Sequence, residues 1–300
     1  MTTGRSFWIA CARIRPAPGW MLAAFIAVHT GVLLGTRTAA FEWGVAGPLL
    51  EATDGWARPT LAAILVMAAA VGVLFGVVGR MRAADLGLTG GWRGGCKGLN
   101  AVLLTYLLWG VAQLLVVGAG LVGLTEVSLN PAWMRPLNPA LLGASATTVL
   151  AGAVLEEVMY RGFLFVHLLL LLRRWGLGRT GALWGALAGS QLVFGLNHVP
   201  VGLAAGFAGS TLVLYVLQVS LVGVMFCVLF VQTNNLYFVM GAHALLNHPE
   251  LPFVAGVHSS FVVLLVVLGL MLARPVLGRV GAGAQGPRPP VFGAAPHGRH

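Results

Sequence analysis

Charged residues are scarce in this sequence. Asp, Glu, Lys and Arg make up 9% of its 300 residues, whereas hydrophobic residues make up 58%, and the mean hydropathy is +0.89. A typical soluble domain is about 25% charged, so this composition argues against an ordinary soluble enzyme. It predicts a polytopic membrane protein, with the lipid bilayer as its main surroundings.

Lysine is nearly absent, and cysteine is rare. The net charge of +10 comes from 17 arginines and one lysine, without a basic run interleaved with aromatic residues, so no nucleic-acid partner is expected. Cys11, Cys96 and Cys227 show neither a CxxC motif nor metal-ligand spacing. They therefore give no evidence for a disulfide framework or a cysteine-based metal site.

A fixed-period repeat, a long extramembrane segment and a clean cleavable signal peptide are also missing. The first apolar stretch begins only after Pro16 and Pro18, and no A-x-A site follows it, so we expect this span to be retained. The segment 275–300 is rich in Gly and Pro, which is typical of a disordered tail.

Apolar stretches long enough to cross a membrane are abundant instead. A hydrocarbon core of ~30 Å needs about 20 apolar residues per helix. The long stretch at 180–249 must be divided, and Pro200 and the polar TNNL at 233–236 are its natural breaks. We therefore predict an all-α bundle of about eight transmembrane helices, at 17–36, 59–79, 100–124, 139–172, 180–199, 205–231, 236–248 and 253–273.

The basic residues predict the orientation of this bundle. With the N-terminus inside, 14 of the 18 Lys and Arg residues fall on the cytoplasmic side, 3 fall outside, and Arg161 lies within a helix. Cytoplasmic loops of membrane proteins are enriched in Lys and Arg. Both termini are therefore expected to be cytoplasmic.

Three ionisable residues interrupt one membrane helix, in the stretch LEEVMYRG at 155–162. An ionised side chain at bilayer depth costs at least ~2.5 kcal/mol, so Glu156, Glu157 and Arg161 should face the bundle interior and have partners. Glu157 and Arg161 stand at i and i+4, in the favourable order for an ion pair. Glu157 is thus predicted to be structural, and Glu156, on the side of Tyr160, to be the free carboxylate.

Two later helices carry polar pairs at the same spacing. Phe194 and His198 lie in FGLNHVP, and His243 and Asn247 lie in HALLNHP. A single histidine in an apolar helix is more often a packing residue than a catalyst. A rise of ~1.5 Å per residue, however, puts Glu156, His198 and His243 at one depth, near the same end of their helices. Together with the arginine distribution, this depth predicts a cavity that opens to the extracytoplasmic side.

The order EExxxR, FxxxH and HxxxN in successive membrane segments resembles the CAAX protease and bacteriocin-processing (CPBP, or Abi) family of intramembrane proteases. EEVMYR, FGLNH and HALLN fit its pattern without departure, and the resemblance covers roughly 140–250. It implies a type II CAAX prenyl endopeptidase-like enzyme that cleaves a membrane-associated peptide or protein. The implied site residues are Glu156, Glu157, Arg161, His198, His243 and Asn247.

The resemblance also divides the chain. We expect N-terminal transmembrane helices at 1–135, a CAAX protease-like catalytic core at 136–250, a last transmembrane helix at 251–274 and a cytoplasmic tail at 275–300.

The chemistry of these residues suggests a mechanism but leaves its metal dependence open. Glu156 and His198 can deprotonate a water for attack on a peptide carbonyl, and His243 with Asn247 can donate hydrogen bonds to the resulting oxyanion. Alternatively, Glu156, His198 and His243 form a three-ligand zinc set with an open position. No HExxH motif is present. We favour the metal-free assignment, with a divalent metal such as zinc as the alternative.

Two interpretations without proteolysis stay open. The chain could be a non-catalytic membrane scaffold, or a proton-coupled transporter in which buried acids and histidines relay protons. Transporters often show inverted repeats of broken helices, and none is apparent in this sequence.

The substrate is not encoded in an obvious way. CAAX processing needs a prenylated C-terminus, whereas the preference for Arg over Lys and the abundance of Ala and Gly indicate a GC-rich bacterial genome. Prenylated substrates are not expected in such a cell. A bacterial plasma membrane is the expected location, and peptide maturation, bacteriocin self-immunity and trimming of membrane proteins all fit.

Overall fold

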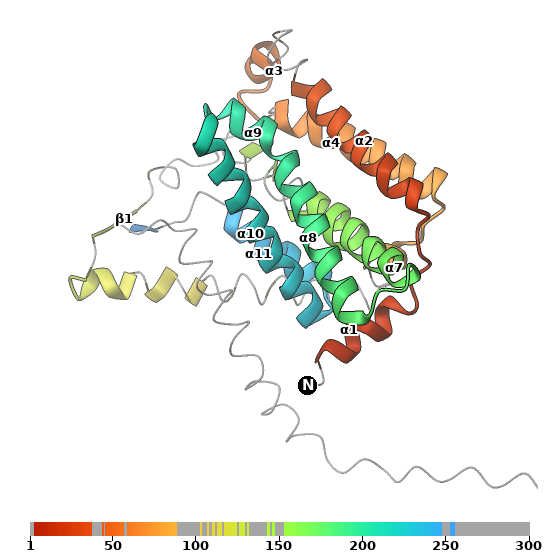
Figure 1. Cartoon of the computed structure of the whole chain (residues 1–300). Helices are drawn as coiled ribbons and strands as arrows, with labels where there is room; N and C mark the ends of the chain where they lie inside the picture. Colours follow the sequence, from red (N-terminus) through yellow and green to blue (C-terminus); the bar gives the residue numbers. More distant parts are fainter. Residues whose placement is uncertain are drawn as a thin grey trace, which may run out of the picture.

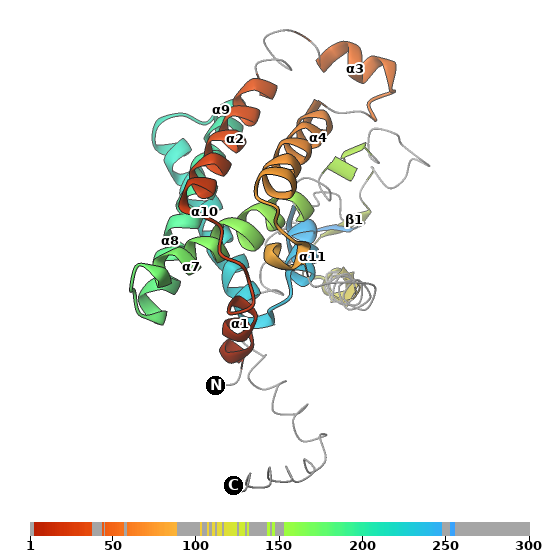
Figure 2. The same ribbon diagram turned by 90° about the vertical axis from the view of Figure 1, so that its right-hand side faces the viewer.

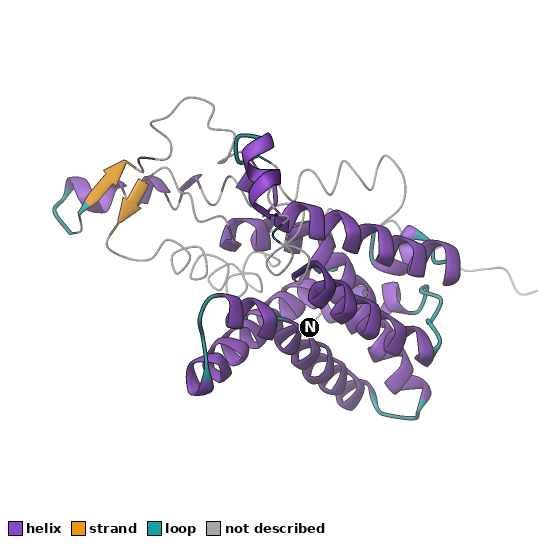
Figure 3. Ribbon diagram, turned by 90° about the horizontal axis from the view of Figure 1, so that it is seen from above, coloured by secondary structure: helices purple, strands orange, loops and turns teal. Residues whose placement is uncertain are grey.

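The computed structural model describes residues 3–37, 44, 46–56, 59–88, 153–247 and 253–255, together with scattered positions between 103 and 147. These residues are mostly helical (Figure 3), as the sequence predicts. Three helices among them are long and apolar enough to cross a membrane: Gly19–Thr36, Thr60–Val78 and Gly209–Thr233. These apolar helices identify a membrane protein. The prediction of eight spans depends in part on residues outside the described ranges.

The N-terminal part contains two long apolar segments that run side by side (Figures 1 and 2). They match the spans predicted at 17–36 and 59–79. The elements in order are α1 (Thr3–Cys11), α2 (Gly19–Arg37), α3 (Ala46–Ala52), α4 (Pro59–Gly72), the π-helix η2 (Val73–Val78) and the 3-10 helix η3 (Ala83–Leu86). The short helices α1 and α3 were not predicted.

The C-terminal part forms the rest of the helical bundle, in which α8 packs against both α7 and α10 (Figure 1). Its elements are the π-helix η6 (Glu157–Phe165), α7 (Val166–Arg174), α8 (Arg179–Asn197), α9 (Val199–Ala204), α10 (Gly209–Thr233) and α11 (Leu236–Asn247). The helices predicted at 180–199, 205–231 and 236–248 correspond to α8, α10 and α11 within a few residues.

The helix predicted at 139–172, which carries the EExxxR motif and is called the motif helix below, is irregular in its described part. Its described part is π-helical at Glu157–Phe165 and becomes α-helical only at Val166. A π-helix has a wider turn with i→i+5 hydrogen bonds, and it is found often at functional sites. The EExxxR motif therefore lies on an irregular helical turn from Glu157 to Arg161, with Glu156 directly before it.

Pro200 was expected only to stop the preceding helix. In the structure α8 ends at Asn197, and Pro200 lies in the first turn of the short helix α9. The first turn tolerates proline because its N–H groups have no partner within the helix. His198 is the junction between the two helices.

The last predicted helix, at 253–273, begins differently. Phe253–Ala255 is the strand β2, which pairs antiparallel with the strand β1 (Val127–Leu129), so that Val127 lies opposite Ala255. The rest of that predicted helix and the tail at 275–300 lie outside the described residues. The helix predicted at 100–124 is described only in part, and its described positions from 103 to 121 are helical. The fold is thus mostly, but not purely, helical.

The motif helix lies between two buried hydrophobic clusters. One is built around Phe165 and Phe226, and the other around Phe25, Tyr160 and Phe163. Aromatic packing on both sides fixes the position of η6 in the bundle.

Gly162 allows the backbone of η3 to approach η6 closely. A Cβ atom at this position would clash with the carbonyl oxygen of Leu86. The motif helix is thereby joined to the segment that follows the second apolar span.

Candidate active site

The buried centre of the site is a cluster of three charged or titratable side chains. Oε1 of Glu157 accepts a hydrogen bond from Nη1 of Arg161 at 2.9 Å and lies 2.6 Å from Nδ1 of His243 on α11. The side chains of Glu157 and Arg161 are completely buried. The ion pair predicted from the i, i+4 spacing is present, and the structure adds His243 as its third member.

Arg161 is held from several sides, as a buried charge requires. Its Nη2 donates to Oε1 of Gln191 at 3.4 Å and to the carbonyl oxygen of Gly223 at 3.3 Å. Its guanidinium carbon lies 4.5 Å from the ring centroid of Phe194 and 5.3 Å from that of Phe226, within cation–π range. Arg161 thus links η6 to α8 and α10.

Glu156 is the accessible carboxylate of the pair. Its side chain is 25% exposed, whereas that of Glu157 is 0% exposed. Oε2 of Glu156 lies 3.9 Å from Nε2 of His243. This distance exceeds a direct hydrogen bond but lies within ion-pair range.

His243 lies between the two glutamates, with one ring nitrogen toward each. An ionised carboxylate only accepts hydrogen bonds, so Nδ1 of His243 carries the proton that is shared with Glu157. Nε2 is then the nitrogen that faces Glu156. The ring of Phe226 stacks on the imidazole with a centroid distance of 4.6 Å, which restricts its rotation.

His198 does not contact Glu156 directly. Its Nδ1 lies 2.8 Å from the carbonyl oxygen of Phe194, and its ring packs edge-on against the Phe194 ring. Because a carbonyl only accepts, Nδ1 is the donor and Nε2 of a neutral His198 is an acceptor. Among the described residues, no hydrogen bond or ion pair joins His198 to Glu156. The partner of Glu156 in the structure is His243.

Asn247 is separate from the cluster. It is the exposed last residue of α11, and within the described part of the chain no hydrogen bond joins it to His243. Of the two residues in the HxxxN motif, His243 therefore contacts a glutamate. For Asn247 no hydrogen bond to the glutamates is found among the described residues.

The predicted metal set does not fit the observed donor positions. Glu156 and His243 are close, but His198 uses Nδ1 on a backbone carbonyl. No group of three or more His, Cys, Asp or Glu side chains among the described residues is arranged to hold a metal ion.

A second polar network beside the site was missed at the level of sequence. Nδ2 of Asn197 donates to the hydroxyl of Tyr160 at 2.8 Å, and Oγ1 of Thr30 donates to Oδ1 of Asn197 at 2.9 Å. The Tyr160 hydroxyl also lies 3.4 Å from the ring nitrogens of His29. Two features of the sequence could have indicated this network: Tyr160 follows Glu156 by four residues, and Asn197 lies inside the FGLNH motif.

Comparison with known families supports one assignment. Residues 138–248 match the family model described as type II CAAX prenyl endopeptidase Rce1-like. The match contains all six predicted site residues and confirms the resemblance drawn from the motifs. No curated protein and no solved structure matches the chain.

Proposed function

Because residues 138–248 match the type II CAAX prenyl endopeptidase Rce1-like family model, we propose that this chain is an intramembrane endopeptidase that cleaves a membrane-associated peptide or protein with a water activated by Glu156. The observation that carries the proposal is the placement of His243, whose Nδ1 is bound by the buried Glu157 while its Nε2 faces the accessible Glu156. Glu157 orients the imidazole of His243, and Glu156 is available to activate a water.

Glu156 is the general base in this scheme. It takes a proton from water as the water oxygen attacks the peptide carbonyl carbon, and it then gives that proton to the leaving amine as the C–N bond breaks. Its partial exposure admits water, and a positioned general base contributes typically 10² to 10⁴-fold to the rate.

The two histidines complete the site. In its imidazolium form, His243 donates from Nε2 to the oxyanion, as preorganised donors do in other acyl-transfer enzymes. His198 presents the acceptor Nε2 at the end of α8 and assists in orienting the water. Arg161 stabilises the position of Glu157, and Asn247 contacts the substrate at the exposed end of α11.

The proposed setting is a multi-pass protein of a bacterial plasma membrane with both termini in the cytoplasm. In Figure 1 the helix ends that carry Arg174 and Arg179 lie opposite α3 and α9. His198 lies at the α9 end. If the arginines are cytoplasmic, the site opens to the other side.

Cleavage products in cells test the proposal whatever the substrate is. We expect new peptide termini in the membrane proteome of cells with the wild-type chain, and their loss in cells without the gene and in cells with Glu156→Gln. Turnover should fall by ~10² or more because the base is lost. Glu51→Gln makes the same chemical change at an exposed position of α3 and should keep full activity.

The purified protein separates the remaining alternatives. Cleavage of a farnesylated peptide but not of its unprenylated form would identify a CAAX-type substrate, and the reverse would exclude it. Activity that a chelator abolishes and zinc restores would contradict the metal-free mechanism. The same new termini in wild-type and Glu156→Gln cells would contradict the proposal and favour a scaffold or a transporter.

A further inference from the structure

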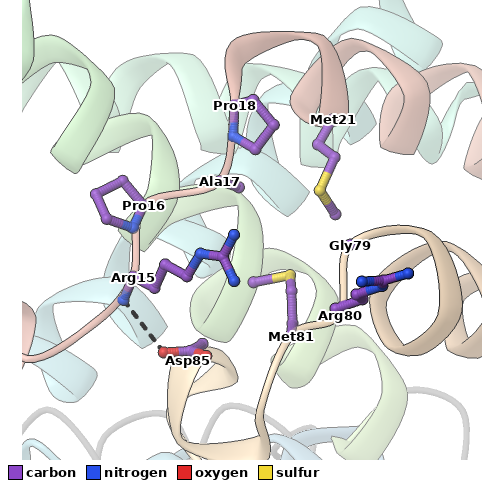
Figure 4. A pocket seen from close by; sticks show the side chains of 9 residues that line it. All are labelled: Arg15, Pro16, Ala17, Pro18, Met21, Gly79, Arg80, Met81 and Asp85. Carbon is purple, nitrogen blue, oxygen red and sulfur yellow. Dashed lines mark hydrogen bonds between the residues drawn. The ribbon is translucent and has the colours of Figure 1, made fainter.

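A small pocket lies outside the candidate active site, where the loop before α2 meets the segment after η2 (Figure 4). It has a volume of about 50 Å³, and its lining includes Arg15, Pro18, Met21, Arg80, Met81 and Asp85. A volume of ~10–15 Å³ in this measure holds one water. The pocket therefore has room for about four oxygen-sized groups, the number in one phosphate.

Two arginines at this pocket have no side-chain partner among the residues that the structure describes. Within the described part of the chain, neither the guanidinium of Arg15 nor that of Arg80 forms a hydrogen bond or an ion pair. Arg80 has a left-handed backbone with a φ of 47°, which is uncommon for a residue other than glycine and is found at ligand sites and tight turns. Both side chains are exposed and free to bind an anion.

The acidic residue of the pocket does not cancel this charge. Asp85 accepts hydrogen bonds from Nε and Nη2 of Arg82 at 3.1 and 3.0 Å, and from the backbone N–H of Arg15 at 3.2 Å. Arg82 therefore balances the Asp85 carboxylate. Arg15 and Arg80 remain as a net charge of two at the pocket.

The position along the chain puts the pocket at the level of lipid headgroups. Arg15 precedes the candidate span Gly19–Thr36 by four residues, and Arg80 follows the candidate span Thr60–Val78 by two. Trp20 at the start of the first span is 56% exposed, and exposed tryptophans are enriched at the membrane–water interface. The N-terminus of α2, with its partial positive charge, begins beside the same pocket.

We propose that this pocket binds the phosphate of an anionic membrane lipid, with Arg15 and Arg80 as its ligands. Arginine matches the geometry of phosphate oxygens in a bidentate manner, and basic pockets between membrane helices bind anionic headgroups. The side chains of Met21 and Met81 also line the pocket and give it an apolar side next to the two arginines. Bound lipid would connect the ends of two neighbouring spans, independently of any proteolytic activity.

The full-length protein in nanodiscs tests this site. Native mass spectrometry would compare retained lipid from discs of phosphatidylcholine with phosphatidylglycerol. We expect the wild type to retain phosphatidylglycerol preferentially, and the variant Arg15→Gln with Arg80→Gln to bind it roughly 30-fold more weakly, at about 1 kcal/mol per arginine. The matched control Arg173→Gln with Arg174→Gln removes the same charge from the exposed end of α7 and should keep the preference.

Three outcomes would overturn the proposal. One is equal loss in both double variants, which would mean attraction by surface charge alone. Another is a wild type without preference for the anionic lipid. The third concerns melting temperatures in detergent. If inorganic phosphate raised that of the wild type as much as phosphatidylglycerol does, and left that of Arg15→Gln with Arg80→Gln unchanged, the ligand would be soluble phosphate. Equal melting temperatures of all variants in pure phosphatidylcholine show that folding is intact.

Discussion

At the scale of single residues, the adjacent glutamates occupy different environments. Glu157 is completely buried and bound to Arg161 and His243, whereas Glu156 is partly exposed. Removing one partner from a buried pair typically costs ~3–5 kcal/mol. We expect Glu157→Gln to lower the melting temperature strongly as well as the activity, while Glu156→Gln lowers activity alone.

Melting curves and cleavage assays on the same detergent preparations check this contrast. The charge-reversed variant Glu157→Arg with Arg161→Glu should recover stability only in part, because the new arginine would face Nδ1 of His243. A stable but inactive Glu157→Gln together with an active Glu156→Gln would exchange the two roles.

The residue-level prediction from sequence succeeded where the partners are close in the chain. Glu157 and Arg161 are one helical turn apart, so their pairing follows from local geometry. The bond between His243 and Glu157 joins residues that are 86 positions apart. This bond depends on how α11 packs against η6. The motif spacing therefore predicted that His243 lies near the site, but it did not predict Glu157 as its hydrogen-bond partner.

At the scale of elements, the hydrophobic stretches located most of the described helices but not their irregular parts. Apolar length predicts where a span lies, because lipid requires every backbone group to be satisfied within it. It does not distinguish the π-helices η2 and η6 from α-helix, since a change from i→i+4 to i→i+5 hydrogen bonds leaves the composition unchanged. The β1–β2 pair joins positions 124 to 128 residues apart and likewise has no local signal.

A glycine on α10 makes the packing around Arg161 possible. A Cβ atom at Gly223 would clash with Oε1 of Gln191 and come within 3.1 Å of Nη2 of Arg161. Overpacking of a tight core costs typically 1–3 kcal/mol, so Gly223→Ala should lower the melting temperature and the cleavage rate. The control Gly181→Ala on α8 has nothing within 4 Å. It should be neutral or stabilising, as alanine is in a helix, and equal melting temperatures of the two variants would contradict the packing described for Arg161.

At the scale of the whole molecule, one polar junction fastens the N-terminal segment to the bundle. His167 on α7 accepts from the backbone N–H of Ala17 at 3.0 Å and donates to the carbonyl oxygen of Asp85 at 3.1 Å. The hydrogen bonds from Arg82 lower the pKa of Asp85 from 3.8 to about 2. Three separate segments thus meet at Asp85.

This junction predicts an acid-sensitive contribution to stability. Because the folded-state pKa of Asp85 is depressed, its contribution is complete above about pH 4 and is lost as the pH falls toward 2. The loss is at most about 2 kcal/mol, reduced by solvent around the exposed Arg82. Asp85→Asn should lower the melting temperature at pH 7 and flatten its fall between pH 4 and 2. The control Asp54→Asn, in an exposed turn, should keep the wild-type pH profile. If the melting temperature of Asp85→Asn fell as steeply as that of the wild type, groups other than Asp85 would cause the acid sensitivity.

The orientation of the whole bundle is open to a direct chemical test. The arginine-rich ends around α7 and α8 and the helix α3 lie at opposite ends of the molecule (Figure 1), and cytoplasmic loops carry the excess of Lys and Arg. In a variant without its three native cysteines, a single cysteine at Thr53 should react with a membrane-impermeant maleimide in intact cells, whereas one at Arg174 should react only after permeabilisation. The opposite pattern would put the accessible side of Glu156 toward the cytoplasm, where a prenylated C-terminus would be presented. The labelling result therefore decides which compartment holds the substrate as well as which side holds the termini.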